Sequence, residues 1–284
     1  MKAEKLYTQL DKDFNVTSLM DDWSFMKFNK YIHSDFKKRY IGLVLDNTSD
    51  VKKVFTATIP DLDILDKLIQ TNQTDCLLFS HHAMGYDPTM IGFPFYDITE
   101  DYLLKLKKQR ISFYVMHIPL DKNGEYSTSV NLAKHLKLEI IDEFCEYMGI
   151  KCGVICKTDK KTAIELGEYV KTLIGHEVKL IRNGSDIIKE GKVAIAAGGG
   201  SVGFAAKEIS ELGINMYITG NTRRVPEVEF IEEFHKIIKD KQINVIGATH
   251  YSTEKHACIA MVRYFEKLGI SSKFIEGRYY LEDL

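Results

Sequence analysis

The chain has 284 residues, of which 45% are hydrophobic and 27% charged, with 38 Lys and Arg against 40 Asp and Glu. This composition is that of an ordinary globular protein, long enough for one large or two smaller domains. The balanced charge and the lack of a long basic run give no electrostatic reason to expect a nucleic-acid partner. The N-terminus lacks an apolar signal core, and no apolar run approaches the roughly 18 residues of a membrane span. We therefore expect a cytoplasmic protein with no membrane or nucleic-acid partner.

The five cysteines form an odd set without CxxC spacing, which is typical of reduced thiols rather than of a disulfide framework. The closest pair, Cys152 and Cys156, lies in a β-like run whose period of two places both on one face. We interpret this pair as packing residues and not as metal ligands.

The first part of the chain predicts a short helix, an aromatic segment and two strands. The helical pattern covers Ala3 to Leu10, and strands are predicted at 41–46 and 51–59 around the turn signal at 47–50. The aromatic segment contains Trp23, Phe25, Phe28 and Tyr31. We interpret these aromatic side chains as core, with an exposed binding role as the alternative.

The rest of the chain alternates helical and strand patterns in the manner of an α/β protein. Helices are predicted from Pro60 to Ile69 and at 99–108, 127–136, 162–174, 204–212 and 226–239, and a last helix runs to Lys267 with Ser252 as its N-cap. Strands are predicted at 77–80, 111–116, 149–157, 177–182, 192–197, 214–218 and 243–247, and a loop at 83–96. In the region that begins at residue 138, short predicted strands at 149–157 and 177–182 flank the predicted helix at 162–174, which indicates a second, smaller α/β lobe. We place the first lobe at 1–137 with 241–284 and the second at 138–240.

A glycine-rich turn follows the strand at 192–197. Gly198, Gly200 and Gly203 satisfy the GxGxxG pattern between a strand and a helix, which is the context of a dinucleotide site. The acidic residue that would hydrogen-bond the ribose of a dinucleotide is absent, since the next strand ends in Thr219, Gly220 and Asn221. Two other interpretations stay open: a turn needed for close helix packing, and an anion-binding turn at a helix N-terminus.

Three predicted strands end in residues that can bind a metal ion. The first ends in His81 and His82, the second is followed by His117 and Asp121, and the third is followed by His250 and Glu254. The carboxyl ends of parallel strands lie on one side of an open α/β sheet, so ligands distant in sequence can meet there. Taken singly, a strand-end histidine is more often structural, and Glu254 would be first-turn charge favoured by the helix dipole.

The donor set favours two divalent ions over one. Three imidazoles, from His81, His82 and His250, and two carboxylates, from Asp121 and Glu254, exceed the three protein ligands of an open zinc site. Two such ions would favour a bridging hydroxide as a nucleophile at neutral pH. We assign His117 beside these ligands, as a catalytic residue that orients a ligand or takes part in proton transfer. Mixed His and carboxylate ligands suit Zn, Fe or Mn, so the native ion stays open.

These segments together resemble the Nif-three-like proteins, a family also called GTP cyclohydrolase 1 type 2 homologues. The matching motifs are Leu78-Phe79-Ser80-His81-His82, Tyr114-Val115-Met116-His117-Ile118-Pro119-Leu120-Asp121, Ile218-Thr219-Gly220 and Gly247-Ala248-Thr249-His250-Tyr251-Ser252-Thr253-Glu254. The resemblance implies metal ligation by His81, His82, Asp121, His250 and Glu254. It also implies two interlinked α/β lobes with mixed, mostly parallel sheets, a metal site at strand C-terminal ends between them, and assembly into a homohexamer.

The expected function is that of a dinuclear metal-dependent hydrolase acting on a small molecule, GTP or another nucleotide. If the substrate is GTP, the nucleophile would attack the imidazole carbon of the purine while an acid or histidine protonates the departing nitrogen. The alternative is a non-catalytic metal-binding, metal-delivery or regulatory protein. The chain departs from the family at Asn221 and at Arg223 and Arg224, where the family often has an acid and an aromatic-His stretch. The two arginines could bind a phosphate group, or they are solvated loop residues.

Overall fold

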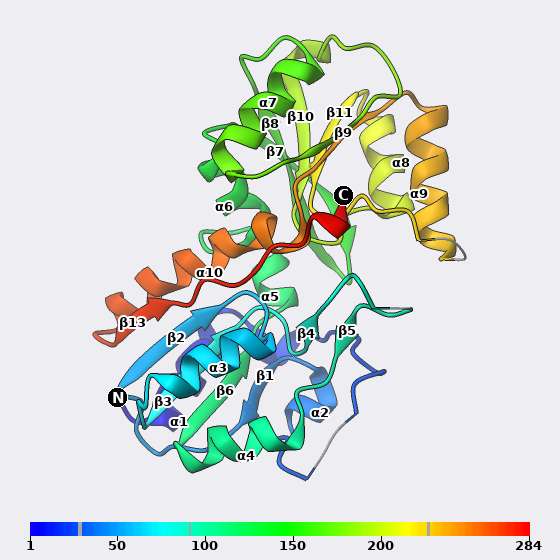
Figure 1. The fold of residues 1–284 in the computed structure, drawn as a ribbon. Helices are drawn as coiled ribbons and strands as arrows, with labels where there is room; N and C mark the ends of the chain where they lie inside the picture. Colours follow the sequence, from blue (N-terminus) through cyan, green and yellow to red (C-terminus); the bar gives the residue numbers. More distant parts are fainter. Residues whose placement is uncertain (28–29, 91, 226–227) are drawn as a thin grey trace. The chain divides into compact units, whose positions relative to one another are not determined.

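The computed structural model describes residues 1–27, 30–90, 92–225 and 228–284. The chain divides into two compact units, each built from two chain segments. Unit 1 contains Met1–Leu120 and Ala257–Arg278, and unit 2 contains Asp121–His256 and Tyr279–Leu284. Helix α10 (His250–Lys267) begins in unit 2 and continues into unit 1 (Figure 1).

Unit 1 is built on a five-stranded sheet whose order is β1-β6-β3-β2-β13. The strands are β1 (Gly42–Leu45), β2 (Lys53–Ala57), β3 (Cys76–Ser80), β6 (Ile111–Val115) and β13 (Ser271–Phe274). All neighbouring pairs are parallel except β1 with β6, which is antiparallel. Strands β3 and β6 are buried along their whole length, which explains their continuous apolar sequences.

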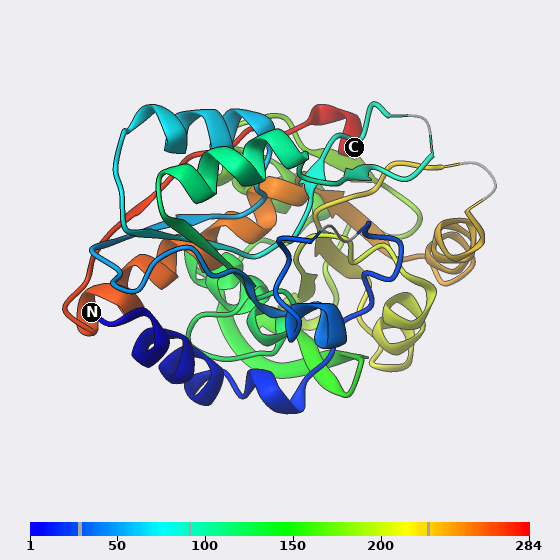
Figure 2. The same cartoon turned by 90° about the horizontal axis from the view of Figure 1, so that it is seen from below.

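Helices of unit 1 bury apolar side chains against this sheet. They are α1 (Ala3–Asp13), α2 (Phe36–Arg39), α3 (Leu62–Gln70), α4 (Glu100–Lys108) and α5 (Ile118–Asp121), with α5 ending at the first residue of unit 2. Helices α3 and α4 lie side by side, and both contribute to one core with the sheet residues Leu78 and Phe113 (Figure 2). A short antiparallel pair, β4 (Gly85–Tyr86) and β5 (Phe95–Tyr96), lies within the segment predicted as a loop.

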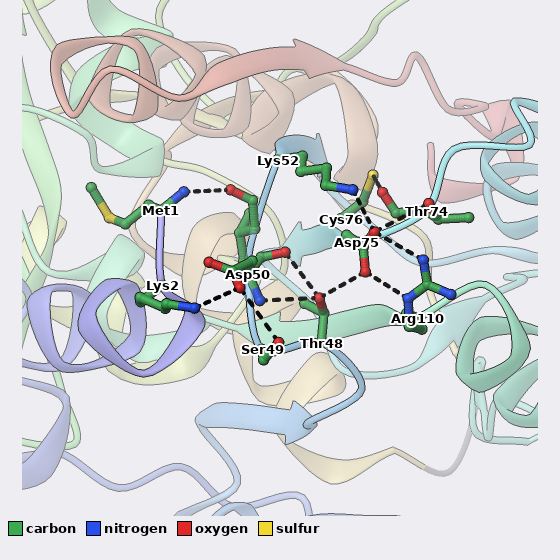
Figure 3. A network of polar contacts seen from close by, with 11 residues as sticks. Met1, Lys2, Thr48, Ser49, Asp50, Lys52, Thr74, Asp75, Cys76 and Arg110 are labelled. Atoms are coloured by element: carbon green, nitrogen blue, oxygen red, sulfur yellow. Dashed lines mark hydrogen bonds and ion pairs between the residues drawn. The ribbon is translucent and has the colours of Figure 1, made fainter.

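The beginnings of three strands in unit 1 are tied together by one carboxylate, that of Asp75 (Figure 3). Asp75 directly precedes β3, and it accepts hydrogen bonds from Lys52, directly before β2, and from Arg110, directly before β6. The Arg110 contact is bidentate, at 2.6 and 2.9 Å. Hydrogen bonds from Arg110 and Lys52 hold the pKa of Asp75 well below its usual range. This network therefore aligns β2, β3 and β6 at their N-terminal ends.

Unit 2 is built on a six-stranded sheet with the order β7-β8-β10-β11-β12-β9. The strands are β7 (Glu139–Tyr147), β8 (Ile150–Lys157), β9 (Lys179–Ile181), β10 (Lys192–Ala196), β11 (Met216–Thr219) and β12 (Asn244–Gly247). The central strands β10, β11 and β12 are parallel, whereas β7, β8 and β9 pair antiparallel to their neighbours. Both sheets are therefore mixed, with parallel strands at their centres.

Helices cover both faces of the second sheet. They are α6 (Thr128–His135), α7 (Ala163–Ile174), α8 (Gly203–Glu211) and α9 (Glu229–Asp240). Alternate residues of β11 point to opposite faces, so Ile218 joins the core that contains Leu166 of α7, and Tyr217 joins the core that contains Ala206 and Phe234. Helix α7 begins at a capping box in which the Thr162 side chain and the Glu165 backbone are paired.

The predicted α/β class with mixed sheets is confirmed, but only the sheet of unit 1 is mostly parallel, since antiparallel pairs outnumber parallel pairs in unit 2. Several element predictions also need correction. Strand β7 was not predicted, because most of its residues are exposed and four are acidic, so it lacks an apolar pattern. The strands predicted at 41–46 and 51–59 exist but are not neighbours, since β1 pairs with β6. Ser252 is not an N-cap, because α10 already begins at His250.

Other expectations map onto the structure as follows. Strand β12 (Asn244–Gly247), which the predicted boundaries placed in the first lobe, pairs with β11 in the sheet of unit 2. In the aromatic segment, Trp23 is buried and Phe25 is 45% exposed, while Phe28 lies outside the described residues. Pro226, the predicted first residue of α9, also lies outside them. Within the part of the chain that the structure describes, no helix has both the length and the apolarity needed to cross a membrane.

Candidate metal centre

Three histidines of unit 1 form a compact cluster at the carboxyl ends of two adjacent parallel strands. His81 and His82 follow β3, and His117 follows β6 after one residue. Because Ser80 lies opposite Val115 in the parallel register, the segments that follow β3 and β6 leave the sheet at the same edge. The ligand nitrogens of the three histidines lie within 4.8 Å of one another. His81 and His82 are buried, and the side chain of His117 is 17% exposed.

Hydrogen bonds fix the ring orientation of two of these histidines. Nδ1 of His81 lies 3.1 Å from the carbonyl oxygen of Met116, and Nδ1 of His117 lies 2.7 Å from Oδ2 of Asp21. A carbonyl or carboxylate oxygen only accepts, so each Nδ1 carries the proton. In the neutral ring the lone pair is then on Nε2, which is the form that binds a metal ion.

Asp21 is a buried residue of this site that the sequence motifs did not reveal. Its Oδ2 accepts a hydrogen bond from Nε1 of Trp23 at 2.6 Å, and its Oδ1 accepts one from the backbone N–H of Asp22 at 2.8 Å. Burial raises the pKa of Asp21, but the His117 imidazole and these hydrogen bonds outweigh it, so the pKa lies below its usual value. The Trp23 ring also packs edge-on against His82 and His117. No spacing pattern links Asp21 to the strand ends, so it could not have been found from the sequence.

Unit 2 carries a second group of potential ligands in the first turn of α10. His250 and Glu254 are one helical turn apart, and Nε2 of His250 lies 3.1 Å from Oε1 of Glu254. Both side chains are buried. The backbone N–H of His250 donates to Oδ2 of Asp283 at 2.8 Å, so a buried carboxylate satisfies a donor at the start of the helix. Asp283 was likewise not predicted.

The glycine turn after β10 contacts the same pair. The N–H of Gly198 donates to Oγ1 of Thr253 at 2.9 Å, which ties the turn to α10. A Cβ atom at Gly198 would lie 1.9 Å from Oε1 of Glu254, and Gly198 has a φ of +67°. The turn thus approaches α10 as closely as the backbone allows, which requires glycine.

Asp121 and the arginine pair have different surroundings. Asp121 is the last residue of α5, and its Oδ1 accepts a hydrogen bond from Oγ1 of Thr128 at 3.2 Å. Among the described residues, no group of three or more close ligand atoms includes Asp121.

The backbone N–H of Arg223 donates to the carbonyl oxygen of Asp283 at 2.8 Å, and Arg224 is exposed.

The chemistry of these donors fits divalent metal ions. Neutral imidazole nitrogens and carboxylate oxygens are ligands for Zn, Fe and Mn. The buried histidine cluster and the buried His250–Glu254 pair could each bind a metal ion. Fold and site together define an α/β protein with two mixed sheets and a candidate metal centre at strand ends.

Comparison with known proteins places the chain in a family. The family model described as Duf34/NIF3 (NGG1p interacting factor 3) matches residues 26–277. The chain therefore belongs to the NIF3 family, and the resemblance drawn from the motifs is confirmed.

Similar proteins match over nearly the full length. A protein of Archaeoglobus fulgidus named GTP cyclohydrolase 1 type 2 homolog is 28% identical over 262 residues, covering 92% of this chain and 96% of the relative. A protein of Pyrococcus horikoshii with the same name is 28% identical over 272 residues, covering 94% and 98%. The solved structure of protein ybgI, described as of unknown function, has a TM-score of 0.74 at 19% identity and covers 98% of this chain and 99% of that one. This last likeness shows the shared fold.

Proposed function

We propose that this chain is a divalent-metal-dependent hydrolase. The observation that carries the proposal is the buried cluster of His81, His82 and His117, whose ligand nitrogens lie within 4.8 Å of one another. Relatives named GTP cyclohydrolase 1 type 2 homolog support a nucleotide, GTP or a related molecule, as the substrate.

We assign the ligand set to His81, His82 and His250 with the carboxylates of Asp121 and Glu254. This number of donors exceeds what one open site takes and suits two ions. A bound divalent ion supplies Lewis-acid polarisation and activates water. The protein contributes orientation: the Met116 carbonyl fixes the His81 ring, and the Gly198 turn confines the Glu254 carboxylate.

His117 is the residue to which we assign proton transfer. Its Nδ1–H is held by Asp21, so Nε2 is the nitrogen that can take up or deliver a proton. If the substrate is GTP, opening of the purine imidazole ring requires a proton on the departing nitrogen. A partly exposed histidine beside two buried ones is suited to that role, because it can exchange protons with solvent.

Metal content tests the ligand assignment. We expect elemental analysis of metal-loaded protein to give about two ions per chain, as a two-metal site requires. The variant His82→Ala should bind fewer ions, and the control His33→Ala should match the wild type. An unchanged stoichiometry in His82→Ala would contradict the assignment.

Turnover tests the enzymatic part. GTP, other nucleotides and phosphoesters are incubated with protein loaded with Zn, Fe or Mn. We expect hydrolysis of at least one of these substrates, with loss of turnover but retained metal in His117→Ala. Metal binding without turnover of any substrate would instead favour the metal-binding or metal-delivery role.

A further inference from the structure

Asp21 hydrogen-bonds His117 of the histidine cluster and is not part of any motif found in the sequence. We propose that Asp21 is a positioning residue that holds His117 as the Nδ1–H tautomer and thereby keeps the lone pair on Nε2. The inference deepens the proposed function and rests on it for the role of His117 at the metal centre. The tautomer itself is a property of the protein without metal.

The geometry of the contact is that of a strong, charge-assisted hydrogen bond. Oδ2 of Asp21 lies 2.7 Å from Nδ1 of His117, and the Asp21 side chain is only 3% exposed. Water competes little for a carboxylate so deeply buried, so the bond to His117 is stronger than it would be at the surface. An imidazole without such a partner is free to place its proton on Nε2, where it would block proton uptake by that nitrogen.

The Asp21 carboxylate is itself held in place from several sides. Trp23 donates to Oδ2 at 2.6 Å, the backbone of Asp22 donates to Oδ1 at 2.8 Å, and the N–H of Asp21 donates to the carbonyl oxygen of Arg39 at 2.9 Å. The Trp23 ring packs against His117 with ring centroids 5.2 Å apart. These contacts leave the carboxylate little freedom to rotate away from His117.

The contrast with His81 shows what Asp21 adds. The His81 ring is oriented by a backbone carbonyl, that of Met116, which carries no full charge. The His117 ring is oriented by a carboxylate, which also makes Nε2 a stronger base. The orientation of His117 therefore depends on a replaceable side chain, whereas that of His81 depends on the main chain.

The test begins with the tautomer. Imidazole nitrogen NMR of metal-free protein at about pH 8, above the ordinary histidine pKa of about 6.5, reports which nitrogen of His117 carries the proton. We expect Nδ1–H in the wild type and in Asp21→Asn, whose amide oxygen still accepts, and a shift toward Nε2–H in Asp21→Ala. Protonation of Nε2 in the wild type, or an unchanged tautomer in Asp21→Ala, would overturn the inference.

Zinc affinity is the second measurement. Because His117 is not among the assigned ligands, Asp21→Ala, like His117→Ala, should bind Zn²⁺ as the wild type does, and a weaker affinity would overturn the inference by showing that Asp21 acts on the ligands themselves and not through His117. The matched control is Asp22→Ala, because Asp22 is exposed and its side chain accepts from the N–H of Ser24 instead. Circular dichroism checks that each variant folds.

The outcomes separate this inference from the proposed function. If the wild type binds no zinc, the proposed function fails, and the tautomer measurement still decides the role of Asp21. If the wild type binds zinc and Asp21→Ala keeps the wild-type tautomer of His117, the inference fails and the proposed function stands. Should Asp21→Ala not fold, the wild-type spectrum decides, because a proton on Nε2 of His117 would contradict the inference.

Discussion

Oε1 of Glu254 occupies the space that a side chain on Gly198 would fill, since a Cβ built there would lie 1.9 Å away. The same Cβ would lie 3.2 Å from Nε2 of His250. The glycine turn after β10 therefore forms one wall of the His250–Glu254 pair. Of the interpretations left open by the GxGxxG pattern, close packing of the turn against a helix agrees with this contact.

Substituting Gly198 should damage both stability and metal binding. In Gly198→Ala the new methyl group displaces the Glu254 carboxylate, and the positive φ adds strain of about 1–2 kcal/mol. We expect urea unfolding to show at least that loss and calorimetry to show weaker zinc binding. The matched control is Gly199→Ala, because a Cβ there meets nothing within 4 Å. Equal behaviour of the two variants would contradict this account.

Asp283 should be required for the start of α10. Its carboxylate accepts the N–H of His250 and is fully buried, so Asp283→Ala leaves a buried donor without its acceptor. The expected cost is about 1–3 kcal/mol in the free energy of unfolding. Asp283→Asn keeps an acceptor oxygen and should lose less. A pair of urea denaturation curves measures the difference, and equal losses in the two variants would show that the hydrogen bond is not the cause.

The stability of unit 1 should depend on pH through Asp75. Its pKa is lowered in the folded protein by Arg110 and Lys52, so the ionised carboxylate is stabilised by folding. This contribution is present above the ordinary aspartate pKa of about 3.9 and is lost as the pH falls below it. Asp75→Asn should be less stable than the wild type at neutral pH, and the difference should shrink below about pH 4.

The control for Asp75 is an exposed ion pair of the same unit. Asp35 pairs with Lys38, and both side chains are more than half exposed. Such surface pairs contribute little, so Asp35→Asn should change the urea midpoint by less than Asp75→Asn at neutral pH. A difference for Asp75→Asn that does not vary with pH would assign its effect to something other than the charge.

Much of the fold could be predicted from the sequence, because buried parallel strands are continuous apolar runs. Strands β3, β6 and β12 are of this kind, and candidate histidine ligands follow each of them within a few residues. Strand β7 could not be predicted, since its side chains are mostly exposed and only pairing with β8 defines it. Strand β1 could be predicted, but its pairing could not, because its partner β6 is distant in the chain.

The residues of the candidate site also include some that could be predicted from the sequence and some that could not. His81, His82 and His117 could be predicted to meet because each follows a strand, and the structure brings these three together. Asp21 and Asp283 could not, because Asp21 lies in an irregular segment and Asp283 in a three-residue 3-10 helix, and only the tertiary fold brings them to His117 and His250. Residues that orient other residues carry no spacing signal of their own.

Self-association stays a prediction that rests on the family resemblance. We expect a homohexamer, because closed symmetric assemblies are the rule among homo-oligomers and the resemblance implies a ring. Light scattering of the purified protein measures the mass directly. A mass equal to that of one 284-residue chain would rule the assembly out.

Arg223 and Arg224 should affect nucleotide binding without affecting metal content. They follow β11 at the end of the parallel strands, and a guanidinium there can bind a phosphate group bidentately. The backbone hydrogen bonds of Arg223 survive substitution by alanine, so the loop should keep its conformation. The double variant Arg223→Ala with Arg224→Ala should weaken the binding of a nucleotide by about 1.5–3 kcal/mol for each charged hydrogen bond lost.

Calorimetric titration of a non-hydrolysable GTP analogue measures this effect for Arg223 and Arg224. The control is Lys239→Ala with Lys241→Ala, two exposed lysines of the same unit whose removal changes the net charge equally. Because a bidentate contact depends on position and a general field does not, only the arginine variant should lose affinity. Equal affinities in all three proteins would show that the two arginines do not contribute to nucleotide binding. An equal loss of affinity in both variants would show that the effect comes from net charge.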